Sequence, residues 1–153
     1  MLKFKNSELF SSSSVFVSVI MPVYNAEPFL KLAIESIINQ TYTNFEFIII
    51  NDGSTDGGLD IIYKYLNIDD RIILINRENK GLIYSLNEAL ALSKGDYIAR
   101  MDADDISECY RLERQVGFLI NNPSYSVVGS HAIAINADGD FIRKIRPPKY
   151  NYI

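Results

Sequence analysis

Short apolar runs rich in β-branched residues alternate with segments of helical period along most of this chain. Four of the runs are predicted strands, at residues 15–21, 45–50, 71–75 and 97–101. Apolar side chains recur at helical spacing over about residues 29–38, 59–66, 82–90 and 112–120. Because the runs are almost continuously apolar, each strand is expected to be covered on both faces. The sequence therefore predicts an α/β fold with a mostly parallel sheet flanked by helices.

The pattern changes after the last predicted helix. Residues 125–131 and 132–135 are predicted strands, and Asn136-Ala-Asp-Gly139 is a hairpin signal before a further strand at 141–145. Residues 1–14 end in a run of serines and lack the features of a signal peptide, so we expect a flexible leader there. The remaining residues, 15–153, are expected to form one domain.

Composition excludes several classes of protein. The net charge of -4 and the pI near 5.0 argue against the basic surface that nucleic-acid binding needs. One cysteine, Cys109, cannot form an internal disulfide, which fits a reducing cytoplasm. The longest apolar run, residues 15–23, is far shorter than the ~20 residues that span a bilayer, so no transmembrane segment is predicted.

Polar residues follow each of the four predicted strands. They are Pro22-Val-Tyr-Asn25 after the first strand, Asn51-Asp-Gly-Ser54 after the second, Asn79-Lys-Gly81 after the third and Asp102-Ala-Asp-Asp105 after the fourth. Ligands of open α/β sheets bind outside the carboxyl ends of the strands, because loops and helix N-termini converge there. We therefore expect a binding site at this edge.

The acidic cluster after the fourth strand indicates a metal site. Asp102, Asp104, Asp105 and Glu108 fall within seven residues, and two like charges 4 Å apart cost roughly 4 kcal/mol at an effective dielectric near 20. Magnesium or manganese would relieve that repulsion, with substrate phosphate oxygens as further ligands. The alternative is a solvated loop in which Asp105 or Glu108 caps the next helix.

Asp52 also has two interpretations. Its carboxylate is able to accept a hydrogen bond from the imide of a nucleobase, with Pro22 and Tyr24 packed against the base. Alternatively, Asp52-Gly53 is an ordinary turn, Ser54 or Thr55 caps the next helix, and the two ring residues close the core.

An ordered series of segments resembles glycosyltransferase family 2. These segments are Val17-Ser-Val-Ile-Met-Pro-Val-Tyr-Asn25, Glu35-Ser-Ile-Ile-Asn-Gln-Thr-Tyr42, Asn51-Asp-Gly-Ser-Thr-Asp56, Asn79-Lys-Gly81 with Ser85-Leu-Asn87, Gly95-Asp-Tyr-Ile98 and Met101-Asp-Ala-Asp-Asp105. The resemblance implies a GT-A fold that transfers a sugar from a nucleotide donor, UDP by default, with inversion and a divalent metal, Mn²⁺ or Mg²⁺.

The resemblance also implies roles for individual residues. The expected donor-binding residues are Pro22, Tyr24, Asn25, Asp52, Asn79, Gly81, Asp102 and Ala103, and the expected metal ligand is Asp104. Arg111 and Arg114 are expected to form salt bridges with Asp105 or Glu108 rather than to bind phosphate. Neither the only histidine, His131, nor Cys109 is assigned any chemistry.

The family's catalytic base comes from a later segment, which lies with the acceptor-binding region. We therefore expect it beyond residue 153, and interpret the chain as a C-terminally truncated GT-A domain whose acceptor-binding part is absent. The alternative function is a donor-binding module without transfer. A nucleotidyltransferase is disfavoured, because no glycine-rich basic loop follows the first strand. A glycan or lipid-linked acceptor is implied. The expected location is cytoplasmic, and peripheral association with the inner face of the membrane is left open.

Overall fold

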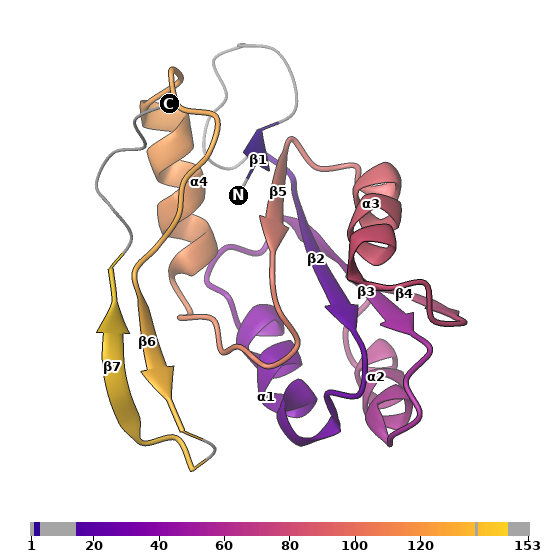
Figure 1. Ribbon diagram of the computed structural model, residues 1–153. Coiled ribbons are helices and arrows are strands. Elements are labelled where there is room, and N and C mark those ends of the chain that lie inside the picture. The colour runs from indigo at the N-terminus through magenta and orange to yellow at the C-terminus, as the bar shows by residue number, and fades with distance from the viewer. Residues whose placement is uncertain (1, 4–14, 137, 147–153) are drawn as a thin grey trace.

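The computed structural model describes residues 2–3, 15–136 and 138–146 of the chain (Figure 1). A five-stranded sheet has the order β1-β5-β2-β3-β4, and a separate two-stranded sheet pairs β6 with β7. The strands are β1 (Leu2–Lys3), β2 (Val17–Val23), β3 (Phe45–Asp52), β4 (Ile72–Arg77), β5 (Tyr97–Arg100), β6 (Ala132–Ile135) and β7 (Phe141–Ile145). The helices are α1 (Glu27–Ile38), α2 (Gly58–Leu66), α3 (Leu82–Leu92) and α4 (Arg111–Asn121).

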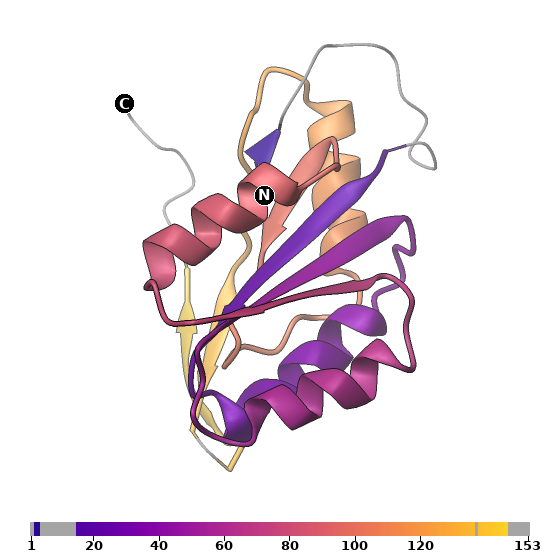
Figure 2. The ribbon, with the colours of Figure 1, turned by 90° about the vertical axis from the view of Figure 1, so that its right-hand side faces the viewer.

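Helices cover both faces of the five-stranded sheet, with α3 on one face and α1, α2 and α4 on the other (Figure 2). Side chains of a strand alternate between the faces, and β3 shows this clearly. Phe47 and Ile49 pack in the core beneath α1, α2 and α4, whereas Ile48 and Ile50 pack against α3. All four are fully buried, which explains why the strand has no polar alternation. The predicted α/β architecture is confirmed.

Pro22 lies inside β2, although the first strand was predicted to end before it. The Met101 N–H donates to Ile20 O, so the backbone groups of Ile20 and, two residues later, of Pro22 face β5. A proline has no N–H to continue that ladder, and β2 keeps only β3 as its neighbour beyond this point. Pro22 thus ends the pairing of β2 with β5 at the edge where polar loops converge.

Two further segments differ from the prediction. Residues 125–131 form no strand, and only Val127 makes an isolated bridge, because this stretch runs as an irregular connection from α4 to β6. Leu2 and Lys3 form β1, antiparallel to β5, although they lie within the predicted flexible leader. The rest of that leader, residues 4–14, lies outside the described residues, as does Ala137 of the predicted hairpin turn.

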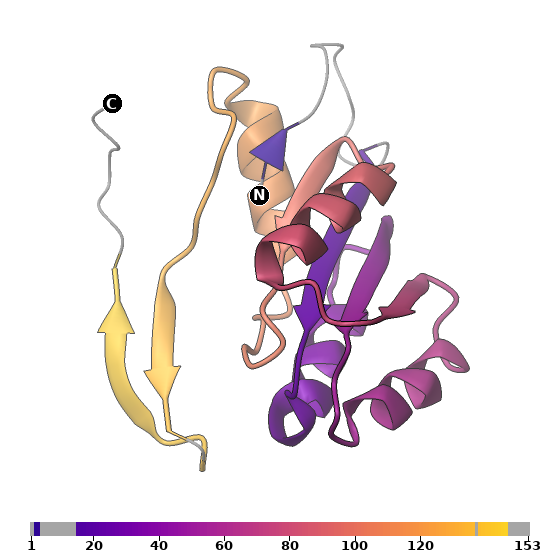
Figure 3. The same ribbon diagram turned by 45° about the vertical axis from the view of Figure 1, so that its right-hand side comes forward.

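The β6–β7 hairpin stands apart from the five-stranded sheet and follows the connection from α4 (Figure 3). Its antiparallel pairing confirms the hairpin prediction, with a register shift between Ala134 and Ile135. Every residue of β7 is exposed, including Phe141 and Ile142. Within the described part of the chain, no helix is long and apolar enough to cross a membrane.

Candidate functional site

Asp52, the last residue of β3, is the best-connected side chain at the carboxyl edge of the sheet. It is only 3% exposed, and each of its oxygens accepts backbone hydrogen bonds. Oδ1 accepts the Lys80 N–H at 2.8 Å and Oδ2 accepts the Gly81 N–H at 2.9 Å. Burial alone would raise the pKa of this carboxyl group, but the N–H donors and the guanidinium of Arg77 together lower it. Asp52 is therefore held ionised and acceptor-only.

Arg77 is the cation that sequence reasoning missed. It ends β4 in register with Asp52, and its Nη1 donates to Asp52 Oδ1. The same guanidinium donates to Glu88 from Nε at 2.7 Å and to Ser85 from Nη2 at 2.9 Å. Burial lowers the pKa of Arg77, but the two carboxylates outweigh burial and raise it. The sequence contains one indication of this ion pair. The strand that ends in Asp52 is followed along the chain by a strand that ends in a basic residue, Arg77.

The loop after β4 closes over Asp52 through a glycine and an asparagine. Gly53 has a φ of +71°, and a Cβ there would lie 2.6 Å from the backbone nitrogen of Asn79. Asn79 Nδ2 donates to the Asp52 carbonyl at 2.8 Å. The Asp-Gly turn is therefore required for this approach, so the turn interpretation and a binding role for Asp52 are compatible.

A hollow of about 290 Å³ lies in front of Asp52. It is lined by Pro22, Val23, Tyr24, Asp52, Asn79, Gly81 and Leu82. Tyr24 and Leu82 are each about half exposed, so one side of the hollow is an open apolar wall. The structure thus brings together five of the residues predicted to bind a donor, and one ionised carboxylate forms part of the lining.

Asn25 does not line this hollow. It has a positive φ of 49°, and its Oδ1 accepts the Thr55 N–H at 2.8 Å while its own N–H donates to Ser54 Oγ. Through these hydrogen bonds, Asn25 connects the end of β2 to the loop after β3. The predicted cap of α2 by Ser54 or Thr55 is wrong for the same reason, because these residues bond Asn25.

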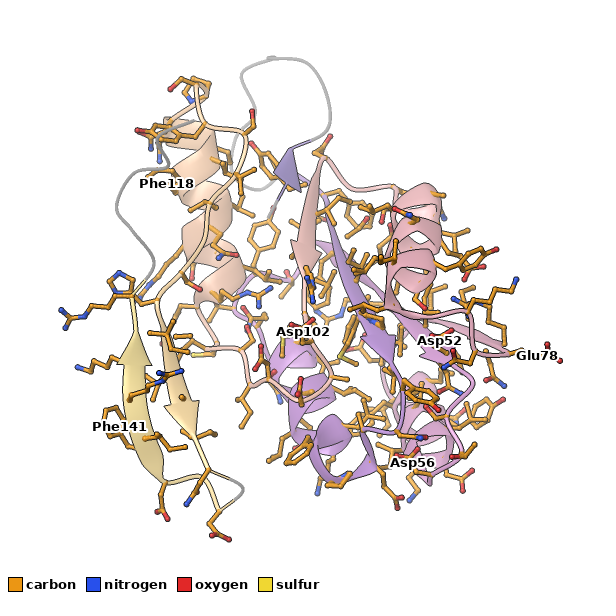
Figure 4. The ribbon with its side chains drawn as sticks, viewed as in Figure 1. Asp52, Asp56, Glu78, Asp102, Phe118 and Phe141 are labelled. Carbon is orange, nitrogen blue, oxygen red and sulfur yellow. The ribbon has the colours of Figure 1, made fainter. Side chains whose placement is uncertain are left out.

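Acidic side chains accept the N–H groups at the start of α2. The Gly58 N–H donates to Asp56 Oδ1 at 3.1 Å, and the Gly57 N–H donates to Glu27 Oε2 at 2.8 Å. Asp56 Oδ2 in turn accepts the N–H of Glu27, the first residue of α1. The N-termini of α1 and α2 therefore stabilise each other through these carboxylates, of which Asp56 is labelled in Figure 4.

The acidic loop, defined here as residues 102–105, follows β5 on the other side of β2. Asp102 and Asp52 both lie at the carboxyl edge of the sheet (Figure 4). Arg100 donates to Asp102 Oδ1 from Nε and Nη2 at 3.0 and 2.8 Å. Ala103 is buried in the core, whereas Asp104 is exposed. The buried alanine thus anchors a turn that presents a carboxylate on each side of it.

The donor set fits a divalent cation that is only partly coordinated by protein. Among the described residues, no three His, Cys, Asp or Glu side chains come together in a metal-binding group. Asp102 and Asp104 supply accessible carboxylates, and Mg²⁺ commonly takes one or two of these and completes its shell with water and phosphate. A structural zinc site is a poor fit, because zinc takes four ligands from the protein.

Gln40 anchors the segment between the acidic loop and α4. This side chain is 4% exposed; its Nε2 donates to Ser107 Oγ and to Glu108 O, and its Oε1 accepts the Leu112 N–H at 3.0 Å. Gln40 thus satisfies a free N–H in the first turn of α4 from 72 residues away. The alternative interpretation of the acidic cluster, in which Asp105 or Glu108 caps α4, does not hold, because the N-cap residue is Tyr110 and the side chain that bonds the first turn is Gln40.

The predicted salt bridges of Arg111 and Arg114 are also absent from the described part of the chain. The Arg111 guanidinium instead contacts the end of β5, where Nη2 donates to Arg100 O at 3.2 Å. The Arg114 guanidinium lies 5.5 Å from the ring centre of Tyr110. His131 and Cys109 are exposed, and no structural observation gives either a chemical role.

Comparison with known proteins shows the family to which this chain belongs. The family model described as "Glycosyl transferase family 2" matches residues 18–153. The chain belongs to this family. Among its relatives is EpsE of Bacillus subtilis (strain 168), named provisionally as a glycosyltransferase, which is 49% identical over 125 residues, covering 80% of this chain and 45% of EpsE. Another is the O-antigen biosynthesis glycosyltransferase WbnJ of Escherichia coli, 37% identical over 138 residues, covering 90% of this chain and 54% of WbnJ.

Solved structures of other glycosyltransferases share the fold. Staphylococcus aureus TarS residues 1–349, in complex with UDP-GlcNAc, superposes with a TM-score of 0.65 at 29% identity, covering 70% of this chain and 32% of TarS 1–349. The mannosyltransferase PcManGT from Pyrobaculum calidifontis, in complex with GDP-Man and Mn²⁺, superposes with a TM-score of 0.64 at 24% identity, covering 75% of this chain and 36% of that one. The GT-A fold predicted from the sequence is confirmed, and the chain spans about half the length of the curated relatives it matches.

Proposed function

We propose that this family 2 chain binds the nucleotide diphosphate of a sugar donor and supplies the donor half of an inverting glycosyltransferase. The observation that carries the proposal is the position of Asp52, an ionised carboxylate held by Arg77 and two backbone N–H groups in the wall of an apolar hollow. An ionised carboxylate only accepts hydrogen bonds, so it selects a donor such as the ring imide of uracil. Pro22 and Tyr24 supply the apolar surface for the base.

The diphosphate is proposed to extend from this hollow toward the acidic loop. There Asp104 is the direct metal ligand, and Asp102, which also lies near the ribose, is positioned by Arg100. The Ala103 backbone keeps the two carboxylates on a short exposed turn. A bound Mn²⁺ or Mg²⁺ supplies Lewis-acid stabilisation of the charge that develops on the leaving diphosphate.

Inverting transfer needs a base for the acceptor hydroxyl, and none of the described residues is assigned that role. The acids after Glu113 are Asp138 and Asp140, and both belong to the hairpin turn. Their N–H groups donate to Asn136 Oδ1, and Asp140 Oδ2 accepts from Asn136 Nδ2. These contacts give both residues a role in the turn. The alternative proposal is a module that binds the donor without transferring the sugar.

The acceptor side of the reaction is also proposed by family membership. A glycan or a lipid-linked glycan would provide the acceptor hydroxyl, with the reaction on the cytoplasmic face of a membrane. UDP is proposed as the nucleotide because a carboxylate that accepts from a ring imide fits uracil. The same contact fits guanine, which also carries a ring N–H.

Calorimetric titration of UDP tests the proposal. We expect binding with Mn²⁺, and loss of binding in EDTA or in Asp104→Ala. Asp138→Ala is the matched control, because it removes one carboxylate of the same kind from the hairpin turn. Absence of UDP binding to the folded chain with Mn²⁺ would contradict the proposal. Release of UDP from a UDP-sugar in the presence of an acceptor would separate a transferase from a binding module.

A further inference from the structure

A second arginine contacts the backbone and side chain of the two residues that precede the acidic loop. Arg111, the first residue of α4, donates from Nη2 to the carbonyl of Arg100 at 3.2 Å and contacts Met101 Sδ from Nη1 at 3.6 Å. Its Nε is buried and has no hydrogen-bond partner among the residues that the structure describes. The guanidinium therefore supports the backbone that leads into the loop, but it makes fewer hydrogen bonds than its five N–H donors allow.

The surroundings of Arg111 are strongly acidic. Burial lowers the pKa of Arg111, whereas the carboxylates of Asp105 and Asp102 raise it. Burial and then the charges of Asp102 and Asp104 raise the pKa of Asp105, and Arg111 and Arg100 oppose them. An arginine side chain stays protonated under these conditions, so Arg111 places a permanent positive charge near the carboxylates of Asp102 and Asp105.

The two arginines differ in how strongly solvent screens them. The side chain of Arg100 is 53% exposed, and its pair with Asp102 lies at the protein surface. Dissolved salt screens such a pair, but it screens buried charges much less. Arg111 is less exposed than Arg100 and its Nε is buried, so solvent and salt screen its charge less.

We propose that Arg111 is a positioning residue that sets the cation affinity of the acidic loop. Its fixed charge stabilises the loop while no metal is bound and opposes a divalent cation that arrives alone. The same charge attracts the anionic diphosphate, so the cation binds well only together with the nucleotide. This inference rests on the proposed function, because it assumes that the cation and the diphosphate meet at this loop.

Binding of Mn²⁺ alone, followed by water-proton relaxation, tests the inference. Removing this positive charge should tighten Mn²⁺ binding in Arg111→Gln by about tenfold. Arg111→Lys keeps the charge and should bind Mn²⁺ within about twofold of wild type. Arg114→Gln, which removes an exposed arginine one turn along the same helix, should match wild type.

Unchanged or weaker Mn²⁺ binding by a folded Arg111→Gln would overturn the inference. Arg111→Gln is also informative if it does not fold in EDTA. If Arg111 acts through its charge, either millimolar Mg²⁺ or the added change Asp105→Asn should restore folding. Failure of both to restore folding would overturn the inference. A role in packing alone predicts no such rescue. Titration of the wild-type protein with UDP and Mn²⁺ separates this inference from the proposed function. If the wild type does not bind UDP with Mn²⁺, the proposed donor site itself is wrong.

Discussion

Arg77 and Asp52 end neighbouring parallel strands in register, and the guanidinium of Arg77 donates to Asp52 Oδ1. The side chains of this ion pair are 12% and 4% exposed. Removing one partner of a buried pair leaves the other charge unpaired, which typically costs about 3–5 kcal/mol. We expect Arg77→Met to lower the free energy of unfolding by about 3 kcal/mol, measured by urea denaturation. Arg143→Met in the exposed strand β7 is the control and should change little.

The same pair predicts how stability depends on pH. The pKa of Asp52 is lower in the folded protein than in the unfolded chain, where it is about 3.9. Its contribution is therefore fully present above that value and is lost as the pH falls through the folded pKa. Asp52→Asn should flatten the fall in unfolding free energy below about pH 4 relative to wild type. A matching effect of Asp60→Asn, in the exposed part of α2, would contradict the assignment.

Nucleotide preference follows from the ionised state of Asp52. Uracil and guanine present a ring N–H to an acceptor, whereas cytosine and adenine present an unprotonated ring nitrogen at the equivalent position. One charge-assisted hydrogen bond contributes about 1.5–3 kcal/mol, so UDP and GDP should bind at least tenfold more tightly than CDP and ADP. Competition calorimetry with Mn²⁺ measures this preference. Equal affinities for all four would show that Asp52 does not contact the base.

Gln40 should be needed for stability and for the order of the segment between the acidic loop and α4. Its four hydrogen bonds join α1, the segment that contains Ser107 and Glu108, and α4. Each buried group left without a partner costs about 1–3 kcal/mol. Gln40→Leu should therefore lower the unfolding free energy by more than about 2 kcal/mol. It should also increase hydrogen exchange at the N–H of Leu112. Asn67→Leu, which removes one exposed hydrogen bond, is the control.

Two glycines give a matched pair of opposite predictions. A Cβ on Gly95 would lie 2.4 Å from the backbone nitrogen of Ser18, so Gly95→Ala should destabilise the protein strongly. A Cβ on Gly117, within α4, would meet nothing within 4 Å. Gly117→Ala should raise the unfolding free energy by about 0.5–1 kcal/mol, because glycine is a poor helix former. Thermal denaturation of both variants checks the pair.

The exposed hairpin predicts self-association. Ile133, Phe141 and Ile142 are each more than half exposed on β6 and β7. Clustered apolar side chains of this kind favour association in water. Sedimentation velocity should show a mass that increases with concentration, and Phe141→Lys with Ile142→Lys should reduce the increase. Ile68→Lys, at an exposed apolar residue outside the hairpin, should leave it unchanged.

Local patterns in the sequence were enough to predict the layered fold. Apolar runs without alternation require burial on both faces, and this property needs no knowledge of the neighbours. The polar residues at the strand ends were predictable for a similar reason, because parallel strands end at one edge of a sheet. Thus Asp52, Asn79 and Gly81 were correctly expected to meet, and the structure places them around one hollow.

Contacts between distant segments were decided only by the tertiary structure. Arg77 meets Asp52 because β3 and β4 pair in a particular register, and Gln40 reaches Leu112 because the segment that precedes α4 lies against the end of α1. Asn25 competes for Ser54 and Thr55, so the cap predicted from their side chains does not form. Each of these outcomes depends on which of several available partners comes closest. The choice among these partners is made only when the chain is packed, whereas the pattern of buried and exposed positions is determined by the sequence.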